Sequence, residues 1–287
     1  MKKVDLHTHT TYSDGSFSPE ELVMLAAEKG LSALAITDHD DIGAAGEASA
    51  YAREKGIEFI PGVELSIEAN LPGRGHLHIL GYEIDIENEE IIDKLNWLKS
   101  ARMTRAVAIV GKLRDVGVDI SLNELEEMVG EGSAGRPHIA QLLVDKKVVT
   151  DIWQAFSGYL SKGRPAYVPK QKLDLQTAIG LIHAAGGIAV LAHPVSLFYT
   201  TYQQYENHLQ EMVNMGLDGL EVYYYSQDWH FREFLMQFLN TRGLIATGGS
   251  DFHGDKKPNI ELGTATGKLE VPYSVVEELR KYKAERI

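Results

Sequence analysis

The sequence predicts an α/β protein with a parallel β-sheet, and three observations support this fold class. Seven short apolar runs, rich in β-branched residues, alternate with segments of helical periodicity. Residue types that bind metals follow several of these runs, at the strand ends that a parallel barrel gathers on one face. The 287 residues are enough for one large barrel or for two ordinary domains.

Each predicted element has its own boundary signals. The strands are expected at Val4–His9, Ala33–Thr37, Phe59–Ser66, Leu77–Tyr82, Ile188–Ala192, Leu220–Tyr224 and Ile245–Gly248. The first helix begins after Ser18, a suitable N-cap, since Pro19 fits the first helical position and Glu21 completes a capping box. It ends at Gly30. Further helices are expected over 43–55, 173–185, 204–215, 228–242 and 272–284.

The segment from about 88 to 171 interrupts the alternation. It opens with apolar residues at helical spacing, at Ile91, Leu95, Leu98, Ala106, Val110 and Leu113. A capping box at Ser121 and Glu124 starts a second helix, and two loops follow at Gly135–His138 and Lys162–Pro165. We interpret this segment as a helical cap inserted between the fourth and fifth strands. The predicted parts are the first part of the barrel (1–88), the cap (89–171) and the second part of the barrel (172–287).

Composition excludes several classes of protein. A formal charge of −13 argues against a large basic surface for duplex DNA. The chain has no cysteine, so it forms neither disulfides nor thiolate metal sites. It lacks an apolar signal segment at its start, and its longest apolar run is too short to span a membrane. The expected location is the cytoplasm, and the sequence does not indicate an oligomeric state.

Nine histidine and acidic residues in short motifs are candidate metal ligands. They are His7, His9, Asp14, His39, Glu64, His78, His193, Asp251 and His253. His7 and His9 share one strand face, and the Glu64 carboxylate on an apolar strand is costly to bury unless it is paired or bound to metal. Imidazole and carboxylate ligands suit Mn, Fe or Zn. Nine ligands exceed the needs of one ion, so the sequence predicts a multinuclear centre and metal-assisted hydrolysis.

These motifs resemble those of the PHP (polymerase and histidinol phosphatase) family of metal-dependent phosphoesterases. The matching segments are His7-Thr8-His9, Thr37-Asp38-His39, Glu64 with His78, Ala192-His193-Pro194 and Asp251-Phe252-His253. The resemblance implies a distorted seven-stranded (β/α)7 barrel and three divalent ions, with Mn favoured over Fe or Zn. By the same resemblance, the three ion sites are His7, His9, Glu64 and Asp251; Glu64, His78 and His193; and Asp14, His39 and His253. Glu64, His193 and Asp251 are then the expected catalytic residues.

The inserted segment also resembles the cap of the TrpH/YciV-like subgroup of this family. That resemblance implies a phosphatase acting on small nucleotides, such as nucleoside 3',5'-bisphosphates or AMP, with the cap over the site. Arg136 and Arg164 are the main candidates for binding substrate phosphate, because a guanidinium group binds phosphate oxygens bidentately. His138 and Lys162, in the same two loops, are further candidates, and Arg102 and Arg105 are weaker ones.

Several other functions remain open from the sequence. The chain can be a 5'-to-3' exoribonuclease on short 5'-phosphorylated RNA or a histidinol-phosphate phosphatase. A non-catalytic metal-stabilised module is disfavoured because all nine ligands are present. An amidohydrolase also begins with a His-x-His strand, but Thr37-Asp38-His39 and Ser250-Asp251-Phe252-His253 match that superfamily less well.

Overall fold

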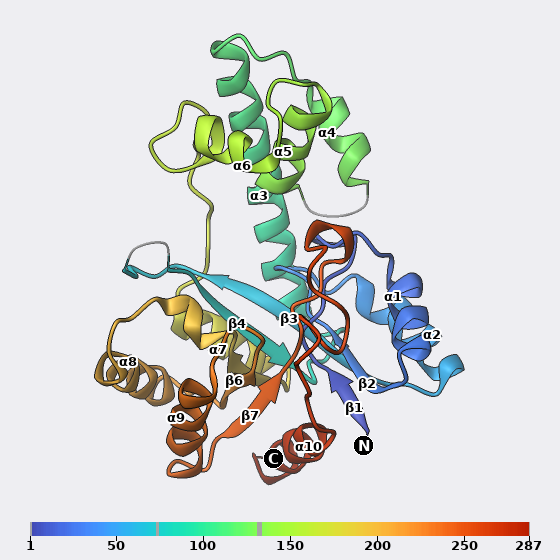
Figure 1. Cartoon of the computed structure of the whole chain (residues 1–287), viewed down its shortest axis with the longest axis vertical. Coiled ribbons are helices and arrows are strands. Elements are labelled where there is room, and N and C mark those ends of the chain that lie inside the picture. Colours follow the sequence, from blue (N-terminus) through green and yellow to red (C-terminus); the bar gives the residue numbers. More distant parts are fainter. Residues whose placement is uncertain (1, 73–74, 131–133, 287) are drawn as a thin grey trace.

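The protein has an α/β fold built on one seven-stranded sheet, as the sequence predicts (Figure 1). The computed structural model describes residues 2–72, 75–130 and 134–286. The strands lie in the sheet in chain order, β1 to β7. Their bounds are β1 Lys3–Asp5, β2 Leu31–Ile36, β3 Glu58–Ile67, β4 Leu77–Tyr82, β5 Ile188–Leu191, β6 Gly219–Tyr223 and β7 Ile245–Gly248.

Most of the helices connect consecutive strands or build the inserted segment. They are α1 Pro19–Glu28, α2 Ala44–Lys55, α3 Glu89–Asp115, α4 Leu122–Val129, α5 Arg136–Asp145, α6 Ile152–Ala155, α7 Leu175–Ala184, α8 Tyr202–Asn214, α9 Trp229–Asn240 and α10 Ser274–Arg286. The predicted capping box of α1 is present, with Ser18 accepting a hydrogen bond from the Glu21 backbone. Shorter helical turns cover Phe156–Leu160, Pro194–Leu197 and Gly254–Lys256.

The prediction of an entirely parallel sheet is wrong at one strand. β4 pairs antiparallel with both β3 and β5, whereas the other neighbouring strands are parallel. Only residues 68–76 join β3 to β4, which is too short for the crossover that parallel neighbours require. The chain therefore turns back, and the start of β4 lies beside the end of β3. His78 consequently reaches the same rim as ligands that follow the parallel strands.

Backbone hydrogen bonds join the two edges of the sheet just beyond β1 and β7. Leu6 donates to the Gly248 carbonyl, Asp251 to the His7 carbonyl and His9 to the Phe252 carbonyl, at N···O distances of 3.2, 2.8 and 2.9 Å. These bonds bring the chain after β1 and the chain after β7 side by side. Four candidate ligands, two from each segment, therefore share one location.

The inserted segment has its own hydrophobic core. That core contains Ile109, Leu113, Leu125, Ile139 and Leu143, together with other residues between Met103 and Val168. The first turns of α3 belong elsewhere, since Ile91, Leu95 and Leu98 pack with β3, β4, α7 and α8 in the main core. Figure 1 shows α3 rising from the sheet into the upper lobe, which also holds α4, α5 and α6.

One predicted loop in this segment is wrong. Gly135–His138 is the start of α5, with Gly135 as N-cap and Arg136 and Pro137 in its first turn. Proline is compatible with this position because the first helical N–H groups have no partner within the helix.

Among the helices of the described ranges, none has the length and apolar character needed to cross a membrane.

Candidate metal centre

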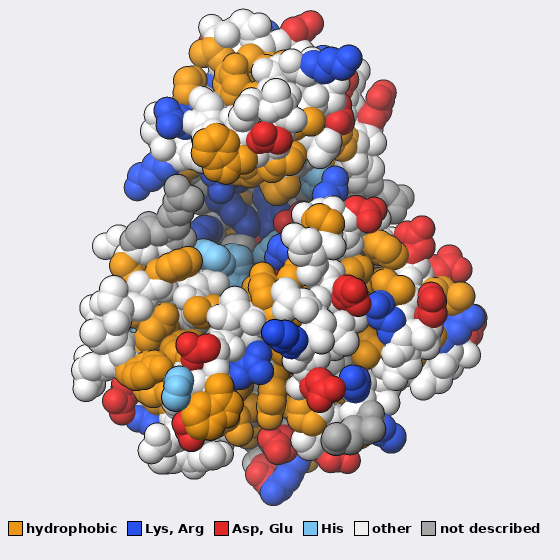
Figure 2. Space-filling model, in the orientation of Figure 1, with side chains coloured by type: hydrophobic (Ala, Val, Ile, Leu, Met, Phe, Trp, Pro, Cys, Tyr) orange, Lys and Arg blue, Asp and Glu red, His pale blue; other side chains and the backbone are white. Residues whose placement is uncertain are grey.

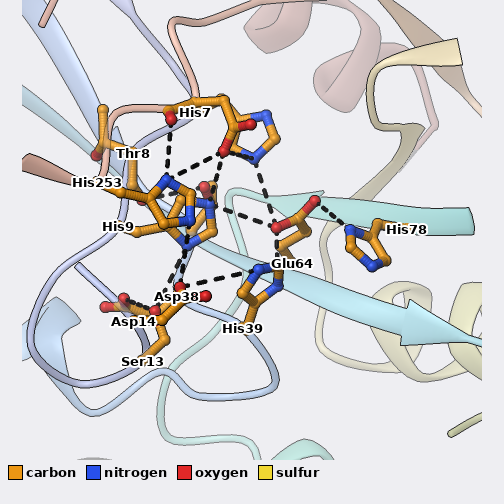
Figure 3. A network of polar contacts seen from close by, with 12 residues as sticks. His7, Thr8, His9, Ser13, Asp14, Asp38, His39, Glu64, His78 and His253 are labelled. Carbon is orange, nitrogen blue, oxygen red and sulfur yellow. Dashed lines mark hydrogen bonds and ion pairs between the residues drawn. The ribbon is translucent and has the colours of Figure 1, made fainter. Parts of the chain in front are cut away.

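All nine predicted ligands converge at one rim of the sheet. Figure 3 labels His7, His9, Asp14, His39, Glu64, His78 and His253 among them. Glu64 on β3 is at the middle of the cluster and is buried. Its Oε1 atom lies 2.8 Å from Nδ1 of His78 and 3.1 Å from Nε2 of His193. Its Oε2 atom lies 2.9 Å from Nδ1 of His39, and 3.5 and 3.4 Å from Nε2 of His7 and His9. A carboxylate in this position can bridge two ions, which one imidazole nitrogen cannot do.

The cluster extends to two further carboxylates. The Asp251 Oδ1 atom lies 3.4 Å from Nε2 of His9 and 3.7 Å from Nε2 of His7. On the solvent side, the Asp14 Oδ1 atom lies 3.2 Å from Nε2 of His253 and 3.9 Å from Nε2 of His39. Among the described residues, four groups of these ligands have ligand atoms within 4.8 Å of one another: His7, His9 and Asp251; His7, Glu64 and His193; His39, Glu64 and His78; and His9, Asp14, His39 and His253.

Unsatisfied buried atoms indicate that the cluster is suited to metal ions. Among the described residues, six candidate ligand atoms are buried and form no hydrogen bond of suitable geometry, although His39 Nδ1 and Glu64 Oε2 lie 2.9 Å apart: His7 Nε2, His9 Nε2, Asp14 Oδ1, His39 Nδ1, Glu64 Oε2 and His193 Nδ1. Leaving a buried polar atom unpaired costs about 1–3 kcal/mol. Divalent cations would satisfy these atoms together, so the donor set fits a metal centre of more than one ion.

The electrostatics of the cluster also favour cations. Burial raises the pKa of the Glu64 carboxyl, but His39, His78 and His7 outweigh burial and hold that pKa well below its usual value. Burial lowers the pKa of His7, but Glu221 and Glu64 raise it well above its usual value. The buried carboxylates therefore stay ionised and attract positive charge, which divalent ions can supply.

Two candidate ligands are held in a backbone conformation that L-residues rarely adopt. His193 has φ 28° and Asp251 has φ 58°. Such conformations cost about 1–3 kcal/mol each and persist where the surrounding contacts enforce them. The His193 N–H donates to Glu221 Oε2 at 2.6 Å, and the Asp251 N–H donates to the His7 carbonyl. These contacts fix the turns that aim both side chains into the centre.

Sequence reasoning missed Glu221, a buried carboxylate beneath the ligands. Its Oε1 atom lies 2.9 Å from Nδ1 of His7, while Oε2 accepts the hydrogen bond from the His193 backbone. A carboxylate that accepts from one ring nitrogen leaves the other nitrogen to face a metal. The signal was present, because Glu221 interrupts an apolar strand in the same way as Glu64.

Two buried aspartates support the loops that carry other ligands. Asp5 accepts hydrogen bonds from Ser250 N, Ser250 Oγ and Gly263 N at 2.9, 2.6 and 2.7 Å, and so fixes the chain that leads to Asp251. Asp38 accepts from Thr10 N, Thr10 Oγ1 and Ser13 Oγ at 2.8, 2.6 and 2.5 Å, which orders the turn that leads to Asp14. Asp251 itself accepts hydrogen bonds from Lys257 Nζ at 2.7 Å and Tyr224 OH at 3.0 Å.

A cleft between the ligand cluster and the inserted segment consists of two adjoining cavities. The first, of about 310 Å³, is lined by candidate ligands and by Lys256 and Lys257. The second, of about 270 Å³, is lined by basic side chains of both lobes. Asp14, His39 and His78 line both cavities. Figure 2 shows blue Lys and Arg side chains and pale-blue His side chains in the hollow below the upper lobe.

The predicted phosphate-binding residues do not all face this cleft. The second cavity is lined by Arg136 and His138, and also by Arg102 and Arg105. Lys162 and Arg164, which belong to the described range 134–286, are exposed and line neither of the two cavities. Lys170 and Lys172, which the sequence reasoning did not identify, line the second cavity instead.

The chain is similar in sequence to a known family and to several known proteins. The model of the PHP domain matches residues 5–225. A 5'-3' exoribonuclease of Haemophilus influenzae is 38% identical over 252 residues, which cover 88% of this chain and 90% of that protein. A 3',5'-nucleoside bisphosphate phosphatase of Chromobacterium violaceum is 33% identical over 269 residues, which cover 92% and 91%.

Solved structures agree with the sequence comparison. A protein of Bifidobacterium adolescentis, assigned as a metal-dependent phosphoesterase, aligns with a TM-score of 0.84 at 30% identity over 98% of this chain and 96% of that one. A Chromobacterium violaceum protein described as an amidohydrolase with bound sulfate aligns with a TM-score of 0.82 at 31% identity, over the same shares.

Proposed function

The chain belongs to the PHP family, whose members include metal-dependent phosphoesterases, and on that basis we propose that it hydrolyses phosphate monoesters of small nucleotides at a trinuclear metal centre. The observation that carries the proposal is the ring of histidine and acidic side chains around the buried Glu64, beside a cleft rich in basic residues. Bound metal ions next to basic side chains suit a substrate that carries phosphate.

The proposed ion sites are those that the family resemblance implies. One ion is held by His7, His9, Glu64 and Asp251, a second by Glu64, His78 and His193, and a third by Asp14, His39 and His253. The grouping of His7, His9 and Asp251, and that of Asp14, His39 and His253, support the first and third sites. The position of Glu64 between the His7–His9 pair and the His78–His193 pair supports its role as a bridge.

The protein's own residues bind the phosphate and hold the ligands in place. Bound divalent ions supply an acidified water as nucleophile and neutralise phosphoryl oxygens. Glu64, His193 and Asp251 would hold these ions at the rim of the sheet. Arg136 and His138 line the second cavity from the inserted segment, which we propose is a cap (89–171), and we propose that they bind phosphate oxygens from that side. We propose Mn as the working ion, since imidazole and carboxylate ligands together suit it.

Phosphate release from reconstituted protein tests this function. Protein stripped with a chelator and reloaded with Mn is assayed on adenosine 3',5'-bisphosphate, AMP, histidinol phosphate and a 5'-phosphorylated dinucleotide. We expect release from the nucleotides. No release from all four by protein with its full complement of metal would overturn the proposal.

Two substitutions test the third ion site. Asp14→Ala and His253→Ala are expected to remove one equivalent of bound metal and nearly all turnover. His208→Ala is the matched control, because this partly buried histidine on α8 lies outside the ligand cluster, where its Nδ1 contacts the Gln204 carbonyl and its ring stacks on Tyr199. Full turnover in either ligand variant would refute the third site.

A second activity, 5'-to-3' exoribonuclease, is supported by the Haemophilus influenzae relative. The open cleft continues beyond the ligands into the cavity lined by basic residues, so a short RNA strand has room for the phosphate that follows its first nucleotide. Digestion of a 5'-labelled oligonucleotide beside a mononucleotide control measures the two activities separately. A mononucleotide product that appears first from the 5' end is the expected result.

A further inference from the structure

One group of possible ligand atoms includes a histidine that the three proposed ion sites do not use. Among the described residues, His76, His78 and His193 have ligand atoms that all lie within 4.8 Å of one another. His78 and His193 are proposed ligands of the second ion, together with Glu64. His76 directly precedes β4 and lines both cavities of the cleft, so it borders the open space beside that ion site.

The backbone holds His76 beside the other two histidines. His78 lies on β4 and His76 lies two residues before it, so the alternation of side chains along a strand places both on one face. The His76 N–H donates to the Ser196 carbonyl at 3.0 Å, and the Ala192 N–H donates to the His78 carbonyl at 3.1 Å. These bonds join the start of β4 to the chain on both sides of His193.

The three imidazole rings have the spacing that a shared ion requires. Their ring centres lie 5.1 Å apart for His76 and His78, 5.2 Å for His76 and His193, and 5.4 Å for His78 and His193. With metal–nitrogen bonds of about 2.0–2.1 Å, an ion lies roughly 3.2 Å from each ring centre, and tetrahedral angles then separate the centres by roughly 5.2 Å. His7 and His9, which are proposed to share the first ion, are also 5.2 Å apart.

Glu64 supplies a fourth ligand atom at the same place. Its Oε1 atom lies 2.8 Å from Nδ1 of His78 and 3.1 Å from Nε2 of His193, so both rings present a nitrogen to one carboxylate oxygen. With His76 added, the set consists of three imidazoles and one carboxylate. Four ligands of these types are the usual coordination of Zn.

We propose that His76 is a fourth ligand of the second ion and gives this site a preference for Zn over Mn. This inference rests on the proposed function, because the second site belongs to the proposed centre. The first site has two imidazoles and two carboxylates, and the third has two imidazoles and one carboxylate. Imidazole favours Zn and carboxylate favours Mn, so the preference for Zn is greatest at the second site. Zn at low concentration therefore enters the second site first, while Mn keeps the other two.

Metal competition tests this ligand without turnover. The full chain, stripped with a chelator and loaded with excess Mn, is titrated with Zn, and the Zn and Mn that stay bound after gel filtration are measured by mass spectrometry. For the wild type, we expect the first equivalent of Zn to bind about tenfold or more tighter than the second. Loss of a partner that only orients a ligand weakens metal binding about 10-fold to 100-fold, so His76→Ala should lose at least about tenfold in affinity for the first equivalent.

Two further measurements identify the role of this side chain. One equivalent of Co(II), used in place of Zn, has visible absorption that is stronger with four ligands than with six, and His76→Ala should weaken it. His76→Glu replaces the imidazole by a carboxylate of similar length. It should keep the metal stoichiometry but lower the preference for Zn over Mn.

His230→Ala is the matched control. His230 is an exposed histidine on α9, beside Trp229 at a ring-centre distance of 5.1 Å, and it lines neither cavity of the cleft. Its loss removes one imidazole without changing the centre, so the Zn titration and the cobalt absorption should stay as in the wild type. Because His76 is also exposed, its variants should keep the far-ultraviolet circular dichroism of the folded chain.

The outcomes separate this inference from the proposed function. A first equivalent of Zn that binds no tighter than the second, an unchanged titration and cobalt absorption in His76→Ala, or an equal loss in the control would each overturn the ligand. Full preference for Zn in His76→Glu would overturn the selectivity. Phosphate release in the presence of Mn tests the function independently, because the metal titration needs no catalysis. A chain that binds Zn as expected but releases no phosphate would contradict the function alone.

Discussion

Glu221 holds two proposed ligands through different atoms, although it is not a ligand itself. It bonds the His7 ring and the His193 backbone from a fully buried position on β6. Glu221→Gln replaces a charged acceptor by an amide, so His7 is oriented less strongly and a backbone contact of the strained His193 is weakened. We expect metal affinity to fall by about 10-fold to 100-fold. Competition with a chromophoric chelator measures this change.

Asp218→Asn is a suitable control, because Asp218 also pairs a buried carboxylate with a histidine at the other end of β6. Its Oδ2 atom lies 2.8 Å from Nε2 of His183. This substitution should lower the melting temperature but leave metal affinity unchanged. Equal effects of both variants on metal affinity would show that Glu221 acts only through stability.

Lys170 should give the cleft a pH dependence. Burial lowers the pKa of this ammonium group to about 8, although Asp40 opposes the shift. Between about pH 7 and about pH 9.5 the cavity then loses one positive charge, and affinity for adenosine 3',5'-bisphosphate in chelator should fall by about tenfold. Lys170→Arg stays charged and should show a much smaller fall. An identical fall in the variant would assign the titration to another group.

The same shift has a defined effect on stability. The folded-state pKa of about 8 is below the ordinary value of 10.5, so between these values the unfolded chain binds more protons at Lys170 than the folded protein. The contribution of Lys170 to the free energy of unfolding therefore rises with pH over that window. Chemical unfolding of the wild type and of Lys170→Met at both ends of the window measures it.

The residues that the sequence could and could not predict differ in a physical way. His7, His9 and Asp251 belong to short motifs at strand ends, and their convergence follows from the parallel arrangement. The contact of Glu221 with His7 could not be predicted, because it depends on which side of β6 faces His7. That orientation depends on the pairing of distant strands. Arg164 and Arg136 both lie in Gly-Arg-Pro sequences, but this similarity does not show whether the side chain points into the cleft.

For the helices and strands, local sequence patterns predicted the residue ranges better than the direction of each strand in the sheet. Leu77–Tyr82 and Ile245–Gly248 have the expected bounds, because apolar alternation marks a strand wherever it lies. The antiparallel direction of β4 depends on the short connection before it, which periodicity does not measure. The start of α5 was interpreted as a loop because glycine and proline are common in turns, although both also occur at helix N-termini.

The junction between β7 and β1 has no space for a side chain at Gly249. A Cβ atom there would lie 2.3 Å from His7 N and 2.4 Å from His7 Cβ. Gly249→Ala must therefore push apart the two segments that carry His7 and Asp251. We expect a loss of about 1–3 kcal/mol in the free energy of unfolding, together with weaker metal binding. Thermal unfolding and chelator competition measure the two effects.

Gly46→Ala is the control for this substitution. Gly46 lies in α2, and a Cβ atom added there meets nothing within 4 Å. Since glycine inside a helix is less favourable than alanine by roughly 0.5–1 kcal/mol, this variant should be slightly more stable. Normal stability and metal binding of Gly249→Ala would contradict the close packing of the junction.

The whole molecule combines a net negative charge with a basic cleft. The formal charge of −13 repels long polyanions at a distance, whereas the cations of the second cavity attract a small phosphate at short range. Raising the salt concentration from about 0.1 M to about 1 M shortens the screening length from about 10 Å to about 3 Å. The KM for adenosine 3',5'-bisphosphate should then rise more than the KM for AMP, with kcat little changed. Equal increases for the two substrates would contradict an unequal number of cation contacts.

The break in alternation predicts an inserted segment, but it does not predict how the first helix of that segment packs. The sequence pattern placed the start of the insertion near residue 89, yet the first turns of α3 pack against the sheet and only its later turns enter the other core. Apolar spacing is continuous along the helix, so it does not show where one packing partner replaces the other. Arg102 and Arg105 lie between these two sections.

This continuity of α3 fixes the angular phase of the upper lobe relative to the sheet. An α-helix advances by about 1.5 Å and turns by about 100° per residue. One residue inserted between Leu98 and Arg102 would therefore swing the upper lobe and both arginines by about 100° around the helix axis. Seven inserted residues, close to two full turns, would restore the facing but lift the lobe by about 10 Å. The number of residues between Leu98 and Arg102 is therefore set by the need to keep both arginines in the cleft.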